Sequence, residues 1–255
     1  MSNGSPRRVL LHFTLAAAGV LLVPAFWVIS KAFFRIPDIY LPSLQSVVEA
    51  AIDLKPGLPS HIEATSTRLL VGFIAGTSLG IAVGLFLASS RFASFLVSPT
   101  VHALRAVPAT AAVPFFLMWF GFGEFGRYLI VLSAVGLNVA VASQQILSEH
   151  SRTHLTFFRS FGLSPGSFPL RYSLPRILEE ILPTLRYSLA LSIGAVAVSE
   201  LLGAQVGLGY LLQTGRSTFA FNLMFLAIIV IGLLASIFDL ALCLLWKRVV
   251  YWKPS

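Results

Sequence analysis

Residues 72–84 read GFIAGTSLGIAVG and lie within a long apolar run that contains no acidic or basic residue. Gly72, Gly76, Gly80 and Gly84 recur every four residues, so on a helix they share one face. A glycine face lets the backbone of a second helix approach closely, which is how helices associate in lipid without a hydrophobic driving force. The stretch therefore predicts helix packing in a compact membrane bundle and not a catalytic site.

The composition of the whole chain indicates the same class of protein. The 255 residues are 56% hydrophobic and 11% charged, with a mean hydropathy of +0.85. Soluble domains carry about 25% charged residues, so this composition disfavours a soluble fold, and its apolar content excludes a disordered chain. The single cysteine, Cys243, rules out an internal disulfide framework. We therefore expect an all-α, polytopic membrane protein.

Six segments are apolar over about the 20 residues that a helix needs to cross the hydrocarbon of a bilayer. Their approximate bounds are Val9–Phe33, Ala64–Ala88, Phe95–Phe120, Arg127–Leu147, Leu182–Leu202 and Met224–Trp246. Arg105, Pro108 and Pro114 interrupt the third segment, which predicts a broken helix there. Between the spans, apolar residues at helical spacing within 44–52 predict a short helix on the outer surface, and residues 205–222 are expected to form an outer loop.

The distribution of basic residues predicts the orientation of the chain, because cytoplasmic loops carry an excess of Lys and Arg. With both termini in the cytoplasm, 11 of the 18 Lys and Arg residues lie on that side. They are Arg7, Arg8, Arg91, Arg152, Arg159, Arg171, Arg176, Arg186, Lys247, Arg248 and Lys253. The net charge of +8 is thereby explained by topology, and we expect no nucleic-acid partner.

Three patterns associated with enzymes or metal sites lack the residues that such chemistry needs. Residues 162–166 spell G-x-S-x-G, but Pro165 has no backbone N–H for an oxyanion hole and no strand precedes the motif. His150 and His154 have helical metal-ligand spacing, but no third ligand accompanies them. No G-x-x-x-x-G-K-[ST] motif is present, so a separate subunit must bind the nucleotide if transport is ATP-driven. We expect no metal site, no cofactor and no enzymatic activity in this chain.

Ionisable residues inside apolar spans are costly, so each should face the bundle interior, a water-filled path or an interface. We interpret Glu200 and Asp239 first as structural, either in an ion pair or snorkelling toward the membrane surface, because both lie near predicted helix ends. Arg105 lies beside Pro108, where a broken helix frees backbone groups, and a pathway role is as plausible there as an ion pair. The candidate pathway and gate residues are therefore Arg105, Pro108 and Glu200.

The order and spacing of several segments resemble the permease subunits of ABC importers, especially those for sulfonates, taurine, nitrate and bicarbonate. Gly162 and Leu174–Pro175 match the second half of the cytoplasmic loop signature of these permeases, G-(x)n-I-x-L-P. Further similar segments are Arg105–Pro108, Pro114, Trp119–Glu124, Ser199–Gly203, Gly207–Tyr210 and Ile228–Asp239. The resemblance covers about residues 41–252, and its specificity lies in the order of the segments.

The resemblance implies a type I ABC importer permease fold, with residues 1–255 as a single transmembrane permease domain and residues 148–181 as a cytoplasmic coupling loop. It also implies a homodimer in the bacterial inner membrane, two ATP-binding ABC ATPase subunits and a periplasmic substrate-binding protein. In the family, a short helix in this loop, here about Arg152–Phe161, docks into a groove of the ATPase. The implied coupling residues are Leu155, Thr156, Phe157, Phe158, Phe161, Gly162, Leu174 and Pro175.

The chain departs from the family pattern within this loop. Thr156, Phe157 and Phe158 stand where the family signature has Glu-Ala-Ala, and Tyr172 stands in place of the isoleucine of I-x-L-P. Leu155, Phe158 and Phe161 still form an apolar stripe at i, i+3 spacing, and Gly162 is a candidate helix C-cap. We therefore expect a docking helix whose partner groove differs in shape.

Two other classes of protein remain as alternatives. A secondary transporter or channel would work without ATP, but such folds often show paired interrupted helices in two related halves, which this sequence lacks. A membrane enzyme would need a nucleophile–base pair or a metal cluster, which the intramembrane polar groups do not form. An arginine in the path would suit an anion such as a sulfonate, nitrate or bicarbonate, while similar permeases carry pyrimidines and other neutral solutes.

Overall fold

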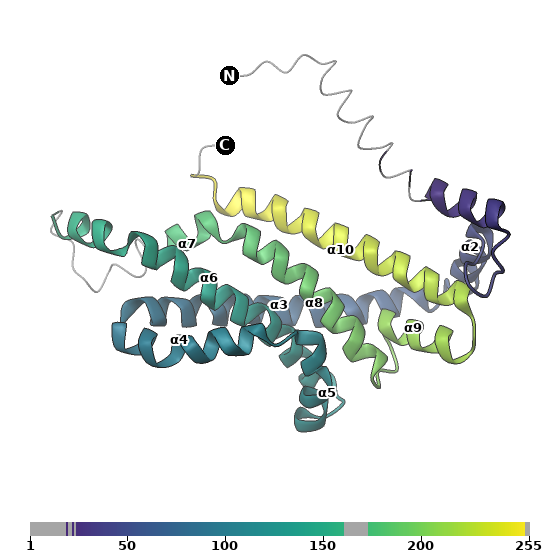
Figure 1. The fold of residues 1–255 in the computed structure, drawn as a ribbon, viewed down its shortest axis with the longest axis horizontal. Helices are drawn as coiled ribbons and strands as arrows, with labels where there is room; N and C mark the ends of the chain where they lie inside the picture. The colour runs from purple at the N-terminus through teal and green to yellow at the C-terminus, as the bar shows by residue number, and fades with distance from the viewer. Residues whose placement is uncertain (1–18, 20–21, 23, 161–172, 253–255) are drawn as a thin grey trace, which may run out of the picture.

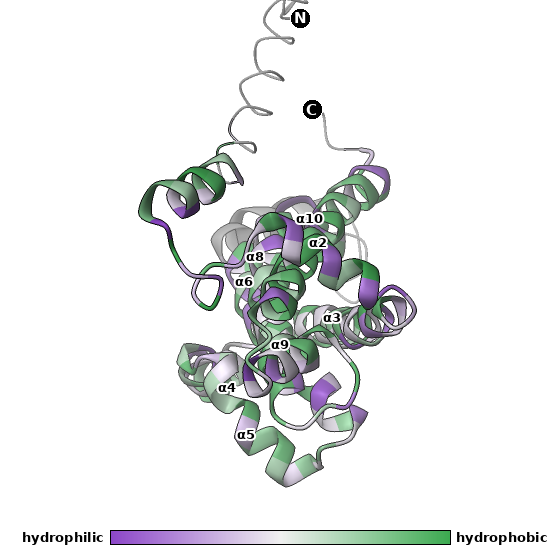
Figure 2. Cartoon of the chain, turned by 90° about the vertical axis from the view of Figure 1, so that its right-hand side faces the viewer, coloured by the Kyte–Doolittle hydropathy of each residue, from purple (hydrophilic) through white to green (hydrophobic). Residues whose placement is uncertain are grey.

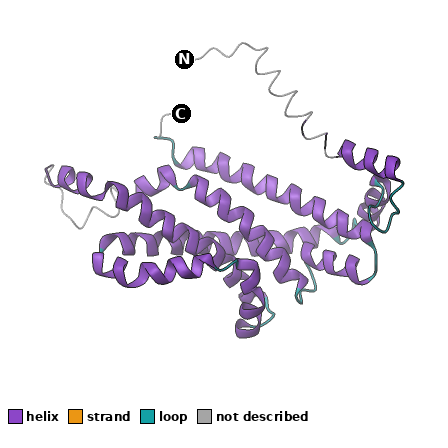
Figure 3. Ribbon diagram, viewed as in Figure 1, coloured by secondary structure: helices purple, strands orange, loops and turns teal. Residues whose placement is uncertain are grey.

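The computed structural model describes Gly19, Leu22 and residues 24–160 and 173–252. Within these residues the chain forms helices joined by turns and loops, with no strand (Figure 3). A short apolar helix at Pro24–Phe34 comes first. It is followed by α2 (Leu44–Asp53), α3 (Leu58–Ser89), α4 (Arg91–Ala106), α5 (Ala109–Phe120), α6 (Glu124–Ser160), α7 (Leu174–Glu180), α8 (Leu182–Leu201), α9 (Leu208–Ser217) and α10 (Phe221–Val249).

Four helices are long and apolar enough to cross a membrane, namely α3, α6 as far as Ser148, α8 and α10. Helices α4 and α5 pass the same criterion only as a bent pair, which gives a fifth span. About half of the first predicted span lies outside the described part of the chain, and the Pro24–Phe34 helix makes up most of its described portion. The fold is therefore the expected all-α membrane bundle, and the predicted count of about six spans is compatible with it.

Helices α3 and α6 pack along the body of the bundle, and the four glycines of α3 form the contact (Figure 1). All four are buried against α6. A Cβ atom at any of them would lie 2.4–2.8 Å from the nearest atom of α6, which is closer than real Cβ atoms approach. The nearest atoms are Val131 Cβ for Gly72, Leu132 O for Gly76, Gly136 O for Gly80 and Ser143 Cβ for Gly84.

The predicted break in the third span is confirmed. Helix α4 ends at Ala106, α5 begins at Ala109, and Val107 and Pro108 between them are extended, with ψ of 122° and 126°. Proline has no N–H to continue the helix and disfavours helical geometry in the residue before it. The two helices are bent by 101° relative to each other, and α5 projects from the body of the bundle (Figure 1).

Two short helices lie where α3 begins and α10 begins, at the right-hand end of Figure 1. Helix α2 is the predicted surface helix: the Ser43 hydroxyl caps it by accepting from the Ser46 N–H at 3.1 Å, and Val47 and Ala50 pack against α10.

The predicted outer loop at 205–222 is instead largely the helix α9. It forms because Leu208 and Leu211 are buried against α10, a contact that the glycine-rich sequence does not reveal.

Most of the apolar surface of α10 faces outward. In Figure 2 this helix is green along most of its visible length. Its exposed side chains are mainly aliphatic, and they include Leu233, Ile237, Leu240, Leu244 and Leu245. A helix that is apolar on all sides but little buried suits a lipid environment rather than water.

Helix packing at the glycine face gives a direct test. Gly80→Ala adds a Cβ that would meet Gly136 O and Val139 Cβ at 2.7 Å, so we expect a loss of about 1–3 kcal/mol in the free energy of unfolding. Gly232→Ala is the matched control, because nothing lies within 4 Å of a Cβ at Gly232 in α10. The midpoint of thermal unfolding of each purified variant in detergent measures the difference, and equal midpoints would contradict the close contact.

Candidate functional site

A buried network of charged side chains joins four elements at the end of the bundle where α3 begins and α8 ends. Arg68 of α3 lies at its centre and is 4% exposed. Its partners come from the first residue of α6, the last turns of α8 and the connection between α8 and α9. The network therefore fixes these four elements relative to one another.

All three nitrogens of the Arg68 guanidinium donate hydrogen bonds. Nε donates to Glu124 Oε2 at 2.7 Å and Nη2 donates to Glu124 Oε1 at 2.6 Å, which is a two-point ion pair. Nη1 donates to Glu200 Oε1 at 2.6 Å and to the Val206 carbonyl at 2.7 Å. Charge-assisted bonds of this geometry are among the strongest that side chains make.

Glu200 is the more deeply buried carboxylate, with 1% of its surface exposed. Besides Arg68, it accepts from the Thr65 hydroxyl at 2.9 Å and from the Gly209 N–H at 2.8 Å. Gly209 and Gly207 must be glycine, because a Cβ at Gly209 would lie 2.3 Å from the Ala197 carbonyl and one at Gly207 would lie 2.4 Å from Glu200 Cδ. Glu200 thus forms an ion pair, which is one of the two structural roles expected for it.

Arg127 of α6 is buried in the same network but is only partly satisfied. Its Nη1 donates to Glu124 Oε1 at 3.3 Å, and its side chain is 4% exposed. Nε and Nη2 have no hydrogen-bond partner among the described residues. Buried donors without partners are rare and costly, so these two groups require an explanation.

The length of α3 places the network near the boundary of the hydrocarbon. A helix of 32 residues is about 48 Å long, compared with about 30 Å of hydrocarbon in a bilayer. If Ser89 marks one boundary, roughly the first 18 Å of α3 extend beyond the other, and Arg68 lies about 15 Å from Leu58. The predicted topology places this end outside.

A second ion pair joins α8 and α10 toward the opposite end. Arg186 Nε donates to Asp239 Oδ1 at 2.7 Å, and Nη2 donates to Oδ2 at 2.6 Å. Asp239 thus forms an ion pair, which is one of the two structural roles expected for it. The side chain of Arg186 is 52% exposed, so this ion pair lies at the surface of the subunit, whereas the Arg68–Glu200 pair is buried.

The candidate pathway residues Arg105 and Pro108 lie at the break between α4 and α5. Arg105 is in the last turn of α4 and Pro108 directly precedes α5. Both side chains are exposed, and no ion pair joins Arg105 to another residue in the described part of the chain. The structure thus brings Arg105 and Pro108 together at the break, while Glu200 belongs to the buried network.

Only some of the candidate coupling residues lie in the part of the chain that the structure describes. Leu155, Thr156, Phe157 and Phe158 lie in the final turns of α6, which continues to Ser160 as one helix rather than ending before a separate coupling helix. Leu174 and Pro175 begin α7. Phe161 and Gly162, with the predicted C-cap, lie outside the described residues.

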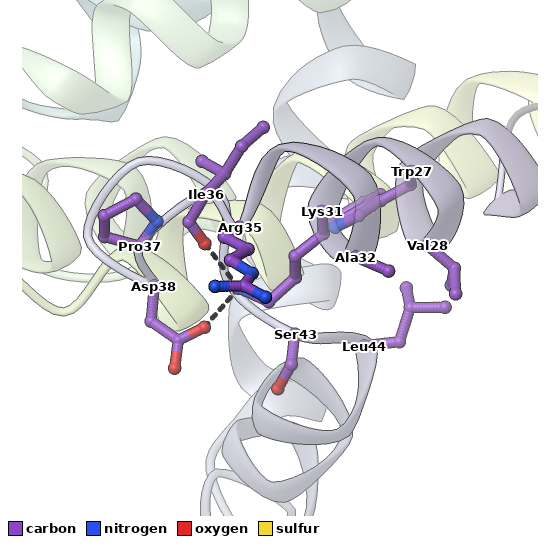
Figure 4. A pocket seen from close by; sticks show the side chains of 10 residues that line it. All are labelled: Trp27, Val28, Lys31, Ala32, Arg35, Ile36, Pro37, Asp38, Ser43 and Leu44. Carbon is purple, nitrogen blue, oxygen red and sulfur yellow. Dashed lines mark hydrogen bonds and ion pairs between the residues drawn. The ribbon is translucent and has the colours of Figure 1, made fainter.

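A cavity of about 650 Å³ lies beside the Pro24–Phe34 helix (Figure 4). Its lining includes Trp27, Lys31, Arg35 and Leu44. Lys31 is committed to holding the turn that follows the helix, through an ion pair with Asp38 and hydrogen bonds to the carbonyls of residues 36 and 41. Lys31 is therefore engaged by the turn beside this cavity.

Sequence reasoning missed three of the four charged members of the network. Arg68 lies within a predicted span and Arg127 at the start of another, so the cost of an intramembrane charge could have identified both. Glu124 had no such signal, because it lies between spans. Among the described residues, no group of three or more His, Cys, Asp or Glu side chains could hold a metal ion.

Residues 76–251 match the family described as binding-protein-dependent transport system inner membrane component. The chain belongs to this family. It is therefore a multi-pass membrane permease, and the resemblance to ABC importer permeases is confirmed.

Several curated permeases are similar over most of their length. The taurine transport system permease protein TauC of Escherichia coli K12 is 26% identical over 246 residues, which cover 94% of this chain and 90% of TauC. The putative aliphatic sulfonates transport permease protein SsuC of the same strain is 28% identical over 235 residues, covering 91% and 89%. The formylaminopyrimidine transport permease protein ThiX of Halalkalibacterium halodurans is 26% identical over 236 residues, covering 92% and 94%.

The fold is also similar to a solved structure. An inward-facing form of the MetNI methionine ABC transporter contains a chain that matches with a TM-score of 0.59 and 20% identity. The match covers 75% of this chain and 93% of the other. This likeness supports the type I permease fold.

The buried ion pair of Glu200 predicts a large effect on stability. Glu200→Ala removes one partner of Arg68 and leaves the Thr65 hydroxyl and the Gly209 N–H without their acceptor. We expect a loss of about 3–5 kcal/mol in the free energy of unfolding. Glu49→Ala on the exposed surface of α2 is the control, with a change within about 0.5 kcal/mol. Unfolding curves in detergent measure both, and similar losses for the two variants would argue against the network.

Proposed function

We propose that this protein is the membrane-spanning subunit of an ATP-driven importer that moves a small anion, such as a sulfonate, nitrate or bicarbonate, into the cell. The family match over residues 76–251 carries this proposal, because the family is defined by transport that depends on a binding protein. A periplasmic binding protein delivers the solute, and two separate ATPase subunits supply the energy. ATP hydrolysis belongs to those subunits, since the chain has no phosphate-binding loop.

The relatives favour an anion as the solute. TauC is named for taurine and SsuC for aliphatic sulfonates, both of which carry a sulfonate group. The exposed Arg105 at the α4–α5 break supplies a positive charge beside backbone that is not helical. A neutral solute is the alternative, since ThiX is named for formylaminopyrimidine.

The break between α4 and α5 supports a pathway between two copies of the chain. Non-helical backbone is tolerated at membrane depth only where protein buries it or where it lines water. In a single subunit the break is exposed, with Leu104 and Val107 half-exposed beside it. A second copy of the chain facing this surface would enclose the break. Arg105 and Pro108 would then line the path of the solute. Glu200, through its ion pair with Arg68, would stabilise the gate at the outer end of the path.

The coupling loop at residues 148–181 is the proposed docking element for the ATPase. Its first part continues α6 and its last part contains α7, so it extends from two ordered helices. In this proposal the single permease domain has both termini in the cytoplasm, and the network of Arg68 lies on the outer side.

Replacing an apolar residue of the docking segment tests the proposed function. Leaving a large apolar side chain in water costs roughly 1.5–3 kcal/mol, so a partner should cover the stripe formed by Leu155, Phe158 and Phe161. We expect Phe158→Asp to reduce the amount of ATPase subunit that copurifies and to stop ATP-driven uptake, with the bundle still folded. Copurification and solute-stimulated hydrolysis in lipid vesicles are the two measurements.

Arg105→Ala is the matched comparison, because it should keep the ATPase subunit bound and lose uptake only. Full ATPase binding and coupled uptake by Phe158→Asp would show that this loop is not the docking element. Absence of any copurifying ATPase from the unmodified protein would favour a secondary transporter or channel.

Thiol labelling tests the orientation of the chain. With Cys243→Ser as background, Ser164→Cys should react with an impermeant thiol reagent only from the cytoplasmic side and Ser217→Cys only from the outside. The reason is the concentration of Lys and Arg between residues 152 and 186 and near both termini. Labelling of both positions from the outside in intact cells would contradict the topology with both termini inside.

A further inference from the structure

We propose that Arg68 and Arg127 form a binding site for the oxyanion group of the solute, and that the Glu124 carboxylate occupies this site in the present conformation. The proposal rests on the function proposed above, because it names the group of the imported anion that is recognised. It assigns to the buried network a role in binding as well as in stability.

The two carboxylates that contact Arg68 differ in how firmly they are held. Glu200 is fully buried and has Thr65 and Gly209 as additional donors, so it is part of the framework. Glu124 has 49% of its side chain exposed, and its hydrogen-bond donors are the two arginines. A group that is open to solvent and held only by the site itself can be displaced by a competing anion.

The geometry at Arg68 is the one that a solute oxyanion would require. Nε and Nη2 point together at the two oxygens of Glu124, at 2.7 and 2.6 Å. A sulfonate, a nitrate or a bicarbonate presents two oxygens with similar separation, so it can accept the same pair of hydrogen bonds.

Arg127 explains why an external anion would fit better than Glu124. Both oxygens of Glu124 are engaged by Arg68, and Arg127 reaches one of them only at 3.3 Å. Its Nε and Nη2 stay without a partner although the side chain is 4% exposed. An oxyanion with a third oxygen nearer to Arg127 could accept from Nη1 and from the neighbouring Nη2, which would leave fewer buried donors unpaired.

The net charge of the network also becomes positive when Glu124 leaves it, as the binding of an anion requires. Arg68 and Arg127 are balanced by Glu124 and Glu200, so the network as observed is neutral. When the Glu124 carboxylate turns toward solvent, the remaining three groups carry a net charge of +1, which suits a monovalent anion. Phe122 and Phe125, exposed on either side of Glu124 in the sequence, offer apolar surface for the alkyl part of an alkanesulfonate.

Ligand-dependent thermal stability tests the site. The full-length protein is purified in detergent with any subunits that copurify, and its melting temperature is measured against ethanesulfonate at constant ionic strength. Glu124→Gln should melt at a lower temperature than the unmodified protein, and ethanesulfonate should restore it. The half-maximal concentration should be at least about tenfold lower than for the unmodified protein, because the internal competitor is gone. The neutral analogue ethanesulfonamide should have no effect.

Two further variants separate binding from stability. Asp239→Asn removes a carboxylate from the two-point ion pair with Arg186, so it should also lower the melting temperature, but without rescue by ethanesulfonate. Glu124→Gln combined with Arg127→Leu should lose the rescue. If Glu124→Gln does not fold, Arg127→Leu alone keeps the Arg68–Glu124 pair and should be protected less by ethanesulfonate than the unmodified protein.

The proposal is overturned if ethanesulfonate fails to rescue Glu124→Gln, if it rescues Asp239→Asn equally, or if Arg127→Leu changes nothing. If ethanesulfonate does not rescue Glu124→Gln, but the protein binds an ATPase subunit and takes up its solute, the anion site is rejected and the proposed function stands. Rescue of Glu124→Gln in a protein that binds no ATPase subunit would reject the importer mechanism and leave the anion site.

Discussion

The contact between the glycine face of α3 and the backbone of α6 sets the positions of the other groups described above. Because the four glycines carry no side chain, the backbone of α3 packs directly on residues of α6 such as Val131 and Ser143. The close approach aligns Arg68 with Glu124 and Arg127 at one end of the contact. The Arg68–Glu200 pair of the network is buried beside this tight apolar contact, while Glu124 stays half-exposed.

The network in turn holds the elements that the glycine contact does not reach. Glu200 attaches the end of α8 to the network, because it also accepts from the Thr65 hydroxyl of α3. The start of α9 is held by two backbone N–H groups. That of Leu208 donates to the Thr65 hydroxyl, and that of Gly209 donates to Glu200. The four helices α3, α6, α8 and α9 thus share one set of polar bonds. A polar network of this kind specifies a single arrangement, because any shift of one segment leaves a buried charge without its partner.

Much of this fold could be predicted from the sequence, because its strongest signals are local. The run at residues 72–84 indicates a packing helix, and Pro108 indicates a break, since both depend on the residues themselves. The helix at Leu208–Ser217 and the pairing of Arg68 with Glu124 depend on contacts between segments far apart in the chain. Glu200 and Asp239 fall between these cases: their position near a helix end indicated an ion pair or snorkelling, but neither the choice between them nor the partner.

The continuity of α6 has a mechanical consequence. This helix runs without interruption for 37 residues, about 55 Å, from Glu124 to Ser160. One end belongs to the arginine network, and the other carries the proposed docking segment for the ATPase. The glycine face of α3 holds α6 between Tyr128 and Gln144, and the rest of the helix extends beyond this contact as a stiff arm. Movement of a bound partner could thus reach the far side of the membrane through one element, without a chain of side-chain rearrangements between them.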